Sequence, residues 1–382
     1  MIINKLTALV SGDDSRYAWQ GLKRFHNIEY TKAEILSSQD VPAKYEKFVK
    51  KQCEQIRYCL VQAEEYSKAA KVVSYATNPL LYYYSIMSLA LAEILYKQDG
   101  NSSLDKARAT HGHHGLELKG AELTTPGADL SVAATQLRAT PHSRSNQRMG
   151  TFELWHRSAR EGAISGKSIT IADGSKQEGQ SILGIARDAR MPQIPDSGIS
   201  LLDCYRRIPR MAPFMASHDI QSGLCRARME LNRDITRDTV SFSVFIHPQS
   251  REVIDSVVDH ITFSSRAFES LHINYVNPGY IFQLTDSLQV PFSHFSLPNA
   301  IQEKIDTVWM CDNNQSLNEF GLYYVAFYIL GNYARYYPDK WMQEIEKSTP
   351  LALSVMELVS AAEDRMPMLL LGELTRSMFI KL

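Results

Sequence analysis

The segment Asn78–Tyr96 has the sequence NPLLYYYSIMSLALAEILY and contains one charged side chain, Glu93. Asparagine is a good N-cap and proline is favoured in a first turn, so Asn78 and Pro79 predict a helix start. A helix that is apolar on nearly all sides is stable only when other elements cover it. The segment therefore predicts a central buried helix, and its apolar run is too short for the ~20 residues that cross a bilayer.

Further helical patterns lie on both sides of this segment. Between Val41 and Lys71, apolar residues recur at spacings of three and four, which predicts one apolar stripe on a helix. Near the C-terminus, Leu322–Tyr336 is apolar and aromatic and stops before Pro338. Two more helices are predicted at Leu351–Ala362 and Met368–Phe379. Both ends of the chain are thus expected to be mainly helical.

The middle of the chain has short β-rich runs separated by glycine and proline. Leu224–Leu231 and Thr239–Ile246 predict two antiparallel strands. Other expected strands are Gly150–His156, Ser168–Ala172 and Tyr280–Leu284, and short helices are expected at Leu201–Ile208 and Val253–Ile261. We predict an α+β fold in three parts: an N-terminal helical part (1–118), a central arginine-rich α+β region (119–296) and a C-terminal helical part (297–382) packed on the N-terminal helices.

Composition excludes several classes of protein. With 382 residues and 44% apolar residues, the chain is too apolar to be mainly disordered. Its five cysteines include no Cys-x-x-Cys pair, which argues against a zinc ribbon or a disulfide framework. Asp13, Asp14 and Arg16 interrupt any signal-peptide pattern. We expect a cytoplasmic protein without membrane contact, and no motif predicts a metal or another cofactor.

Arginine is unevenly distributed along the chain. Between Arg138 and Arg266 there are 16 arginines and two lysines against 14 acidic residues, a net charge of +4 that leaves −5 for the rest. The planar guanidinium fork suits phosphates, carboxylates and buried pairs, whereas lysine suits solvated surface. The middle is therefore predicted either to bind an outside anion or to pair with acids of the helical ends.

The densest basic part, from Arg138 to Arg160, contains one acidic residue, Glu153, and several interleaved aromatic rings. A groove for single-stranded nucleic acid needs this mixture, because charge follows the backbone while rings stack on bases. The candidate residues for binding nucleic acid or another anion are Arg138, Arg144, Arg148, Trp155, Arg157 and Arg160.

Three histidines lie within the segment His111–Gly115, HGHHG, but no separate motif adds ligands for a metal. Arg108 precedes His113 and His114 at a spacing that resembles the Arg-x(4–6)-His pattern of HEPN-type ribonucleases, which are helical and need no metal. That resemblance implies a histidine acting as general acid or base on the ribose 2′-hydroxyl and Arg108 stabilising the phosphorane. Such pairs also arise by chance, and the glycines disfavour a regular helix here.

Five short segments carry a wider resemblance. They are NPLLYYY at Asn78–Tyr84, HGL at His114–Leu116, Leu201–Pro209, YARYYPDKW at Tyr333–Trp341 and Arg365–Pro367. Together they are similar to motifs of the YaaC-like family, a largely uncharacterised bacterial family. The resemblance implies a soluble, mainly helical fold and supplies neither a reaction nor catalytic residues.

The C-terminal motif also has a local physical interpretation. Arg335 lies near the end of an apolar helix, where a cation favours the helix dipole, and Trp341 is expected to pack back on that end. If Arg335 is buried it needs an acid, and Glu93 and Glu319 are the candidates. Arg335 and Trp341 are thus predicted to form a structural clamp or to bind a ligand.

These patterns predict a non-enzymatic accessory or binding protein whose arginine-rich middle binds nucleic acid or an acidic protein partner, with a role in phage defence as an expectation for this class of protein. Two alternatives stay open. One is a HEPN-like, metal-independent ribonuclease using Arg108 with His113 or His114. The other is a purely structural subunit of a homo-oligomer or larger complex, for which Leu322–Tyr336 on the surface would mark the interface.

Overall fold

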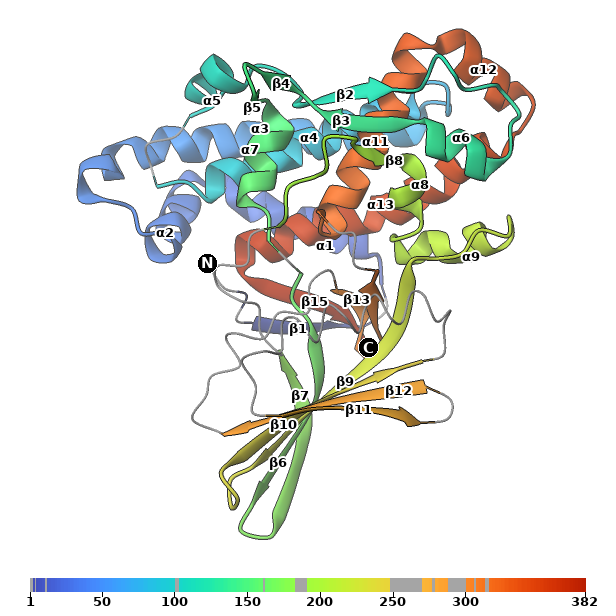
Figure 1. The fold of residues 1–382 in the computed structure, drawn as a ribbon. Helices are drawn as coiled ribbons and strands as arrows, with labels where there is room; N and C mark the ends of the chain where they lie inside the picture. Colours follow the sequence, from blue (N-terminus) through green and yellow to red (C-terminus); the bar gives the residue numbers. More distant parts are fainter. Residues whose placement is uncertain are drawn as a thin grey trace.

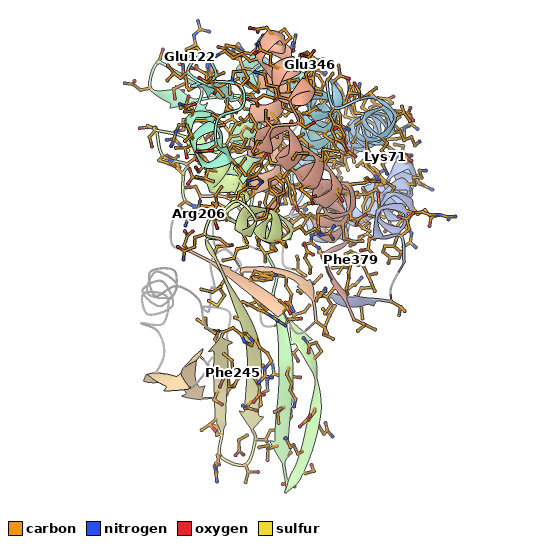
Figure 2. The ribbon with its side chains drawn as sticks, turned by 90° about the vertical axis from the view of Figure 1, so that its right-hand side faces the viewer. Lys71, Glu122, Arg206, Phe245, Glu346 and Phe379 are labelled. Atoms are coloured by element: carbon orange, nitrogen blue, oxygen red, sulfur yellow. The ribbon has the colours of Figure 1, made fainter. Side chains whose placement is uncertain are left out.

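The computed structural model describes residues 3, 5–10, 12–99, 103–160, 162–182, 191–247, 270–276, 279–287, 300–305, 307–312 and 316–382. Its helices gather in one half of the molecule, and a large sheet extends from that half as an elongated projection (Figure 1). The side view shows side chains filling the space between the helices, with Phe379 at the junction and Phe245 out on the projection (Figure 2).

Helix α4 (Asn78–Tyr96) is the central buried helix, as predicted. Helices α3 (Glu46–Val72), α11 (Glu319–Tyr336) and α13 (Pro350–Thr375) pack around it. Among the described residues α4 is the one helix long and apolar enough to cross a membrane, and 72% of its apolar window is buried inside the protein.

The start of α4 differs slightly from the expectation. Its N-cap is Thr77, one residue earlier, and the Asn78 amide instead donates a hydrogen bond of 2.7 Å to the carbonyl of Ala70 at the end of α3. Asparagine therefore joins two helices here, and Pro79 occupies the first turn as expected.

Shorter helices complete the helical half. They are α1 (Asp14–Leu22), α2 (Ile28–Ser38), α5 (Leu104–His111), α6 (Leu130–Gln136), α7 (Thr151–Ser158), α8 (Leu201–Tyr205), α9 (Ala212–Ala216) and α12 (Pro338–Glu346).

Two predictions of secondary structure are wrong. The segment expected as a strand at Gly150–His156 is the start of helix α7, because its apolar side chains bury one helical face against α4. The two helices expected near the C-terminus are one helix, α13, which continues through Pro367 and ends where strand β15 (Ser377–Lys381) begins. Pro367 is buried inside this helix, and its packing offsets the hydrogen bond that proline removes.

Ten of the described strands form one mixed sheet. They are β1 (Lys5–Leu9), β6 (Ser165–Ala172), β7 (Ser175–Ile182), β9 (Leu224–Asp234), β10 (Thr239–Ile246), β11 (Ser270–Val276), β12 (Gly279–Ser287), β13 (Ala300–Lys304), β14 (Thr307–Cys311) and β15. The main order is β1-β15-β13-β14-β9-β10-β12-β11, and β6 pairs with β9 and β7. The antiparallel pair β9–β10 confirms the predicted hairpin. The helix expected at Val253–Ile261 lies outside the described residues.

The fold is α+β, as predicted, and both ends of the chain are mainly helical. Each end also supplies a strand, since β1 and β15 pair in parallel within the large sheet. Helices α6 to α9, which belong to the central part of the sequence, lie in the helical half. The three sequence segments are therefore interwoven in space.

Two small β-structures lie on top of the helices. Strands β2 (Leu116–Lys119), β3 (Arg138–Pro141) and β8 (Ile199–Ser200) form a three-stranded sheet. Strands β4 (Ser143–Arg144) and β5 (Gln147–Arg148) form a hairpin directly after β3. These pieces place the histidine segment next to the beginning of α7.

Candidate functional site

Most of the arginines predicted to bind an anion are bonded to groups of the protein itself. Arg138 donates to the carbonyls of Ser197 and Gly198 at 3.2 and 3.0 Å. Arg148 pairs with Asp196 at 2.5 Å, and Arg157 pairs with Glu153 at 2.8 Å. These interactions are partly exposed, so they contribute little to stability, and each arginine uses one or two of its five N–H donors in them.

Arg160 and Trp155 are buried. Arg160 donates two hydrogen bonds to Glu373, and the Trp155 indole donates to Glu93 at 2.8 Å. The Trp155 ring is fully enclosed by core side chains and does not face solvent. The predicted mixture of cations and rings is therefore divided between the surface and the interior.

Arg144 differs from its neighbours. It is exposed on the β4–β5 hairpin, and within the described part of the chain it has no ion pair or side-chain hydrogen bond. Ser145 and Asn146 at the tip have φ values of 50° and 61°, the positive values of a tight two-residue turn. The hairpin thus holds Arg144 toward solvent.

The hairpin begins next to a cluster of histidines. The rings of His113 and His142 lie 5.2 Å apart, and His142 Nδ1 is 2.8 Å from a carboxylate oxygen of Glu117. Lys119 pairs with the other oxygen of Glu117 at 2.7 Å. Bonds from Lys119 and His142 hold the pKa of Glu117 below its usual value. This part of the cluster joins β2 to the residue that precedes β4.

His114 occupies the inner side of the cluster. Its Nδ1 lies 2.8 Å from the hydroxyl of Tyr83, which α4 supplies, and its ring contacts Tyr328 of α11. Burial raises the pKa of Tyr83 well above its ordinary value, so its hydroxyl stays protonated. Because a hydroxyl can donate to Nδ1 or accept from it, His114 keeps this partner in both protonation states.

Backbone bonds fix the loop that carries these histidines. The first amides of α7, at Thr151 and Phe152, donate to the carbonyls of His113 and His114 at 2.8 and 3.0 Å. The loop and the helix start approach so closely that a Cβ at Gly150 would lie 2.2 Å from the Cα of Gly115. Glycine at both positions permits this contact.

The arginine near His114 is Arg335 at the end of α11. Burial first, and then the charge of Arg335, lower the pKa of His114 below 6.5. Arg335 donates to the hydroxyl of Tyr84 at 2.9 Å and lies over the ring of Tyr336, which is 59% exposed. Arg335 is exposed, so it does not pair with Glu93 or Glu319, the two acids considered for a buried Arg335.

Arg108 does not belong to this arrangement. It is exposed on α5, and its charge acts on Asp105 and on the Cys59 thiol of α3. Arg108 is therefore not part of the histidine cluster, and the guanidinium group whose charge acts on His114 is that of Arg335, which is far away in the sequence.

Trp341 packs back on the end of α11, as predicted. Its ring is buried against Tyr333, and its indole donates to the carbonyls of Tyr75 and Ala76 before α4. Arg335 is the exposed member of this motif and Trp341 the structural one.

Helix α11 is covered by the rest of the chain. Every residue from Glu319 to Ala334 is buried, so the helix does not present the apolar interface that the structural-subunit hypothesis requires. Among the described residues, no group of three or more His, Cys, Asp and Glu side chains is arranged to hold a metal ion.

Comparison with known proteins identifies the family. A family model for YaaC-like proteins matches residues 23–374, nearly the whole chain. The chain belongs to the YaaC-like family. No curated protein and no solved structure matches it significantly.

Three of the motifs that carried the YaaC-like resemblance meet in the histidine cluster, since Tyr83 belongs to the NPLLYYY segment. His114 comes from the His-Gly step, and Arg335 comes from the YARYYPDKW segment. Sequence reasoning missed Tyr83, Tyr84, His142 and Tyr336 as their neighbours. The signal was weak, because tyrosines on apolar helices are ordinarily core residues and His142 lies within an arginine-rich run.

Proposed function

We propose that this YaaC-like protein binds single-stranded RNA across the histidine cluster and cleaves it without a metal ion. The observation that carries the proposal is the position of His114, with a hydroxyl partner at Nδ1 and a guanidinium group nearby. These are the groups that transfer of a phosphoryl group to a neighbouring ribose hydroxyl requires. The site keeps the chemistry expected from the Arg–His pattern, with Arg335 in the place of Arg108.

His114 is the general base of the proposed reaction. Its lowered pKa keeps the imidazole neutral at pH 7, so Nε2 can accept the proton of a ribose 2′-hydroxyl while Nδ1–H donates to Tyr83. The 2′-oxygen then attacks phosphorus, and the 5′-oxygen leaves with a proton from a second imidazole. His113 and His142 are the candidates for that acid, and Arg335 stabilises the negative charge on the phosphorane.

Two neighbouring features support RNA as the ligand. The ring of Tyr336 is exposed beside Arg335 and offers a face for stacking a base. Arg144 reaches solvent from the hairpin that follows His142 and can contact a backbone phosphate. In this arrangement a base would stack on Tyr336, the scissile phosphate would lie at His114 and Arg335, and a flanking phosphate would contact Arg144.

The test is cleavage of a fluorescent single-stranded RNA in EDTA. We expect wild-type protein to cleave it, and His114→Ala and Arg335→Ala each to reduce the rate at least 100-fold. His218→Ala, which changes a half-buried histidine that follows α9 and contacts the ring of Phe214, serves as the matched control and should cleave normally. Equal rates for wild type and both site variants would reject the proposal.

A second candidate function is binding without cleavage, the accessory role predicted from the arginine-rich middle. The exposed Arg144 favours it. If the protein binds RNA but does not cleave it, Arg144→Ala should weaken binding across all sequences and reduce its salt dependence by about one counterion. RNA binding that is unchanged by Arg144→Ala and by salt would exclude the β4–β5 hairpin as the binding surface.

The expected role in phage defence is part of this proposal. Bacteria that express the wild-type protein should form fewer phage plaques than bacteria that express His114→Ala. Equal plaque counts would show that the activity of His114 does not protect the bacteria against phage.

A further inference from the structure

A cavity lies where the helical half meets the sheet, away from the histidine cluster. Its volume is about 90 Å³. Helix α13 and strand β15 form one wall, near Phe379 in Figure 2, and the start of α11 and strand β13 form the others. A water molecule takes up about 30 Å³, so the cavity can hold a small organic group.

Two buried ion pairs line the cavity. Arg160, which follows α7, donates to Glu373 at 3.0 and 3.4 Å, and Arg365 forms a two-pronged pair with Glu319. Lys97 bridges Glu93 and Glu373 at 2.5 and 2.9 Å. The lining itself has two cations for three carboxylates, and Lys97, which lies behind it, brings this group of charges to neutrality.

Among the ion-paired side chains that line the cavity, the hydrogen-bonding capacity that remains consists of donors. Both oxygens of Glu93 are bonded, one to Lys97 and one to Trp155. Both oxygens of Glu373 and of Glu319 accept from guanidinium groups. In contrast, within the described residues Nη1 of Arg160 and Nη1 of Arg365 have no partner, although each arginine is more than nine-tenths buried.

The start of α11 adds to these donors. This 18-residue helix begins at the cavity with Asn318, Glu319 and Phe320, so the positive end of its dipole faces the same space. Dipole and guanidinium donors together favour a ligand group that accepts hydrogen bonds and carries negative charge.

The rest of the lining is apolar. Phe320, Met368 and Phe379 are among the side chains that border the cavity, and they favour a short hydrocarbon body. A doubly charged phosphate would add more charge than this neutral group of charges can compensate, whereas a single carboxylate can be held by the free N–H donors.

We propose that this cavity binds a small organic monocarboxylate, with its carboxylate against the free donors of Arg160 and Arg365 and its apolar body against Phe320, Met368 and Phe379. The ligand class is a short-chain carboxylic acid. Nothing in this proposal depends on RNA, so it stands or falls separately from the proposed function.

Calorimetric titration of the full chain tests the ligand class. Butyrate should bind at least tenfold more tightly than butyramide, which has the same size without the charge, and n-butylamine should not bind. Inorganic phosphate should bind at least tenfold more weakly than butyrate. Equal binding of butyrate and butyramide, preference for phosphate or the amine, or no binding of butyrate would each overturn the proposal.

Variants of single residues test whether butyrate binds in this cavity. Arg160→Lys keeps a cation for Glu373 but removes the Nη1 donor, and should weaken butyrate binding about tenfold. Its control is Arg157→Lys, on the exposed side of α7, which should bind normally. Ala163→Phe should fill the cavity and abolish binding, whereas Ala172→Phe, at the far end of β6, should not. Thermal unfolding checks that each variant is folded. Normal butyrate binding by both Arg160→Lys and Ala163→Phe would reject this cavity as the binding site.

Discussion

At His114, two neighbours act on one imidazole. Tyr83 binds its inner nitrogen, and Arg335 places a positive charge close enough to disfavour the protonated ring. Burial acts in the same direction and is the larger cause. The protonation of His114 is therefore set by residues from α4 and α11 that sequence distance separates.

Removing the charge of Arg335 should raise the pKa of His114. In wild type that pKa lies below 6.5, so the acid limb of the pH–rate profile, where the neutral ring of His114 is lost, should lie below that value. Arg335→Ala should move the pKa toward 6.5 and Arg335→Lys should leave it nearly unchanged. An NMR titration of the imidazole C–H signals measures both, and an unchanged pKa in Arg335→Ala would contradict the assigned pair.

The buried pair of Arg365 and Glu319 should be sensitive to loss of one partner. Arg365→Met leaves the buried carboxylate of Glu319 without its cation, whereas Glu303 keeps Arg210, and this should cost about 3–5 kcal/mol of unfolding free energy. Urea unfolding measures this loss. The exposed pair of Lys51 and Asp105 is the control, and Lys51→Met should leave the urea midpoint unchanged.

At the scale of elements, the contact between the histidine loop and α7 depends on glycine. Gly150 has φ +108° and faces the backbone of Gly115, so an added methyl group meets both a forbidden conformation and a clash. This contact positions the carbonyls of His113 and His114 over the first amides of α7.

Gly150→Ala should therefore destabilise the protein by at least about 3 kcal/mol and reduce RNA cleavage. Gly174→Ala is the matched control, because Gly174 also has a positive φ, +78°, but has no atom within 4 Å of the added position. The control should cost only about 1 kcal/mol, from backbone strain alone. Chemical denaturation compares the two, and equal losses would show that the close approach does not matter.

At the scale of the whole molecule, burial is uneven between the two halves. Helices α4 and α11 lie within the main core, whereas the first five residues of β7 are all exposed on the projecting sheet. Local opening needs less free energy where few side chains are buried.

The rates of amide hydrogen exchange should differ between the buried helices and the exposed part of the sheet. Amides of α4 and α11 should exchange most slowly, at rates near those of global unfolding, and amides near the β6–β7 turn should exchange much faster. Mass spectrometry of peptic fragments resolves the segments. Comparable protection of β7 and α11 would mean that the sheet and helices unfold as one unit.

The sequence predicted the elements with the strongest periodicity. The helical segments around Asn78–Tyr96 and Leu322–Tyr336, and the β9–β10 hairpin, agree with the structure. Gly150–His156 was wrong because a short apolar run fits a strand and a buried helix equally well, and burial against α4 selects the helix. The break predicted between Ala362 and Met368 is absent, because α13 continues through the buried Pro367.

The sequence predicted only part of the candidate site. His113, His114 and Arg335 were candidates from their motifs, but Arg108 was chosen as the partner because it is near in sequence. Arg335 takes that place only because α11 packs against α4 and β2. The Nη1 donors that are left over in the cavity could not be found before the ion pairs of Arg160 and Arg365 were known.

Local patterns alone predicted a buried helical centre, strands in the middle of the chain and a resemblance to the YaaC-like family. The family model over residues 23–374 confirms that family. Such features depend on residues within about one helix length of each other, so they survive without knowledge of the fold. Packing decided which arginines face solvent, which acids neutralise the others and which cation lies beside His114. Those outcomes depend on desolvation and on distances between residues far apart in the chain, which exist only after the chain has folded.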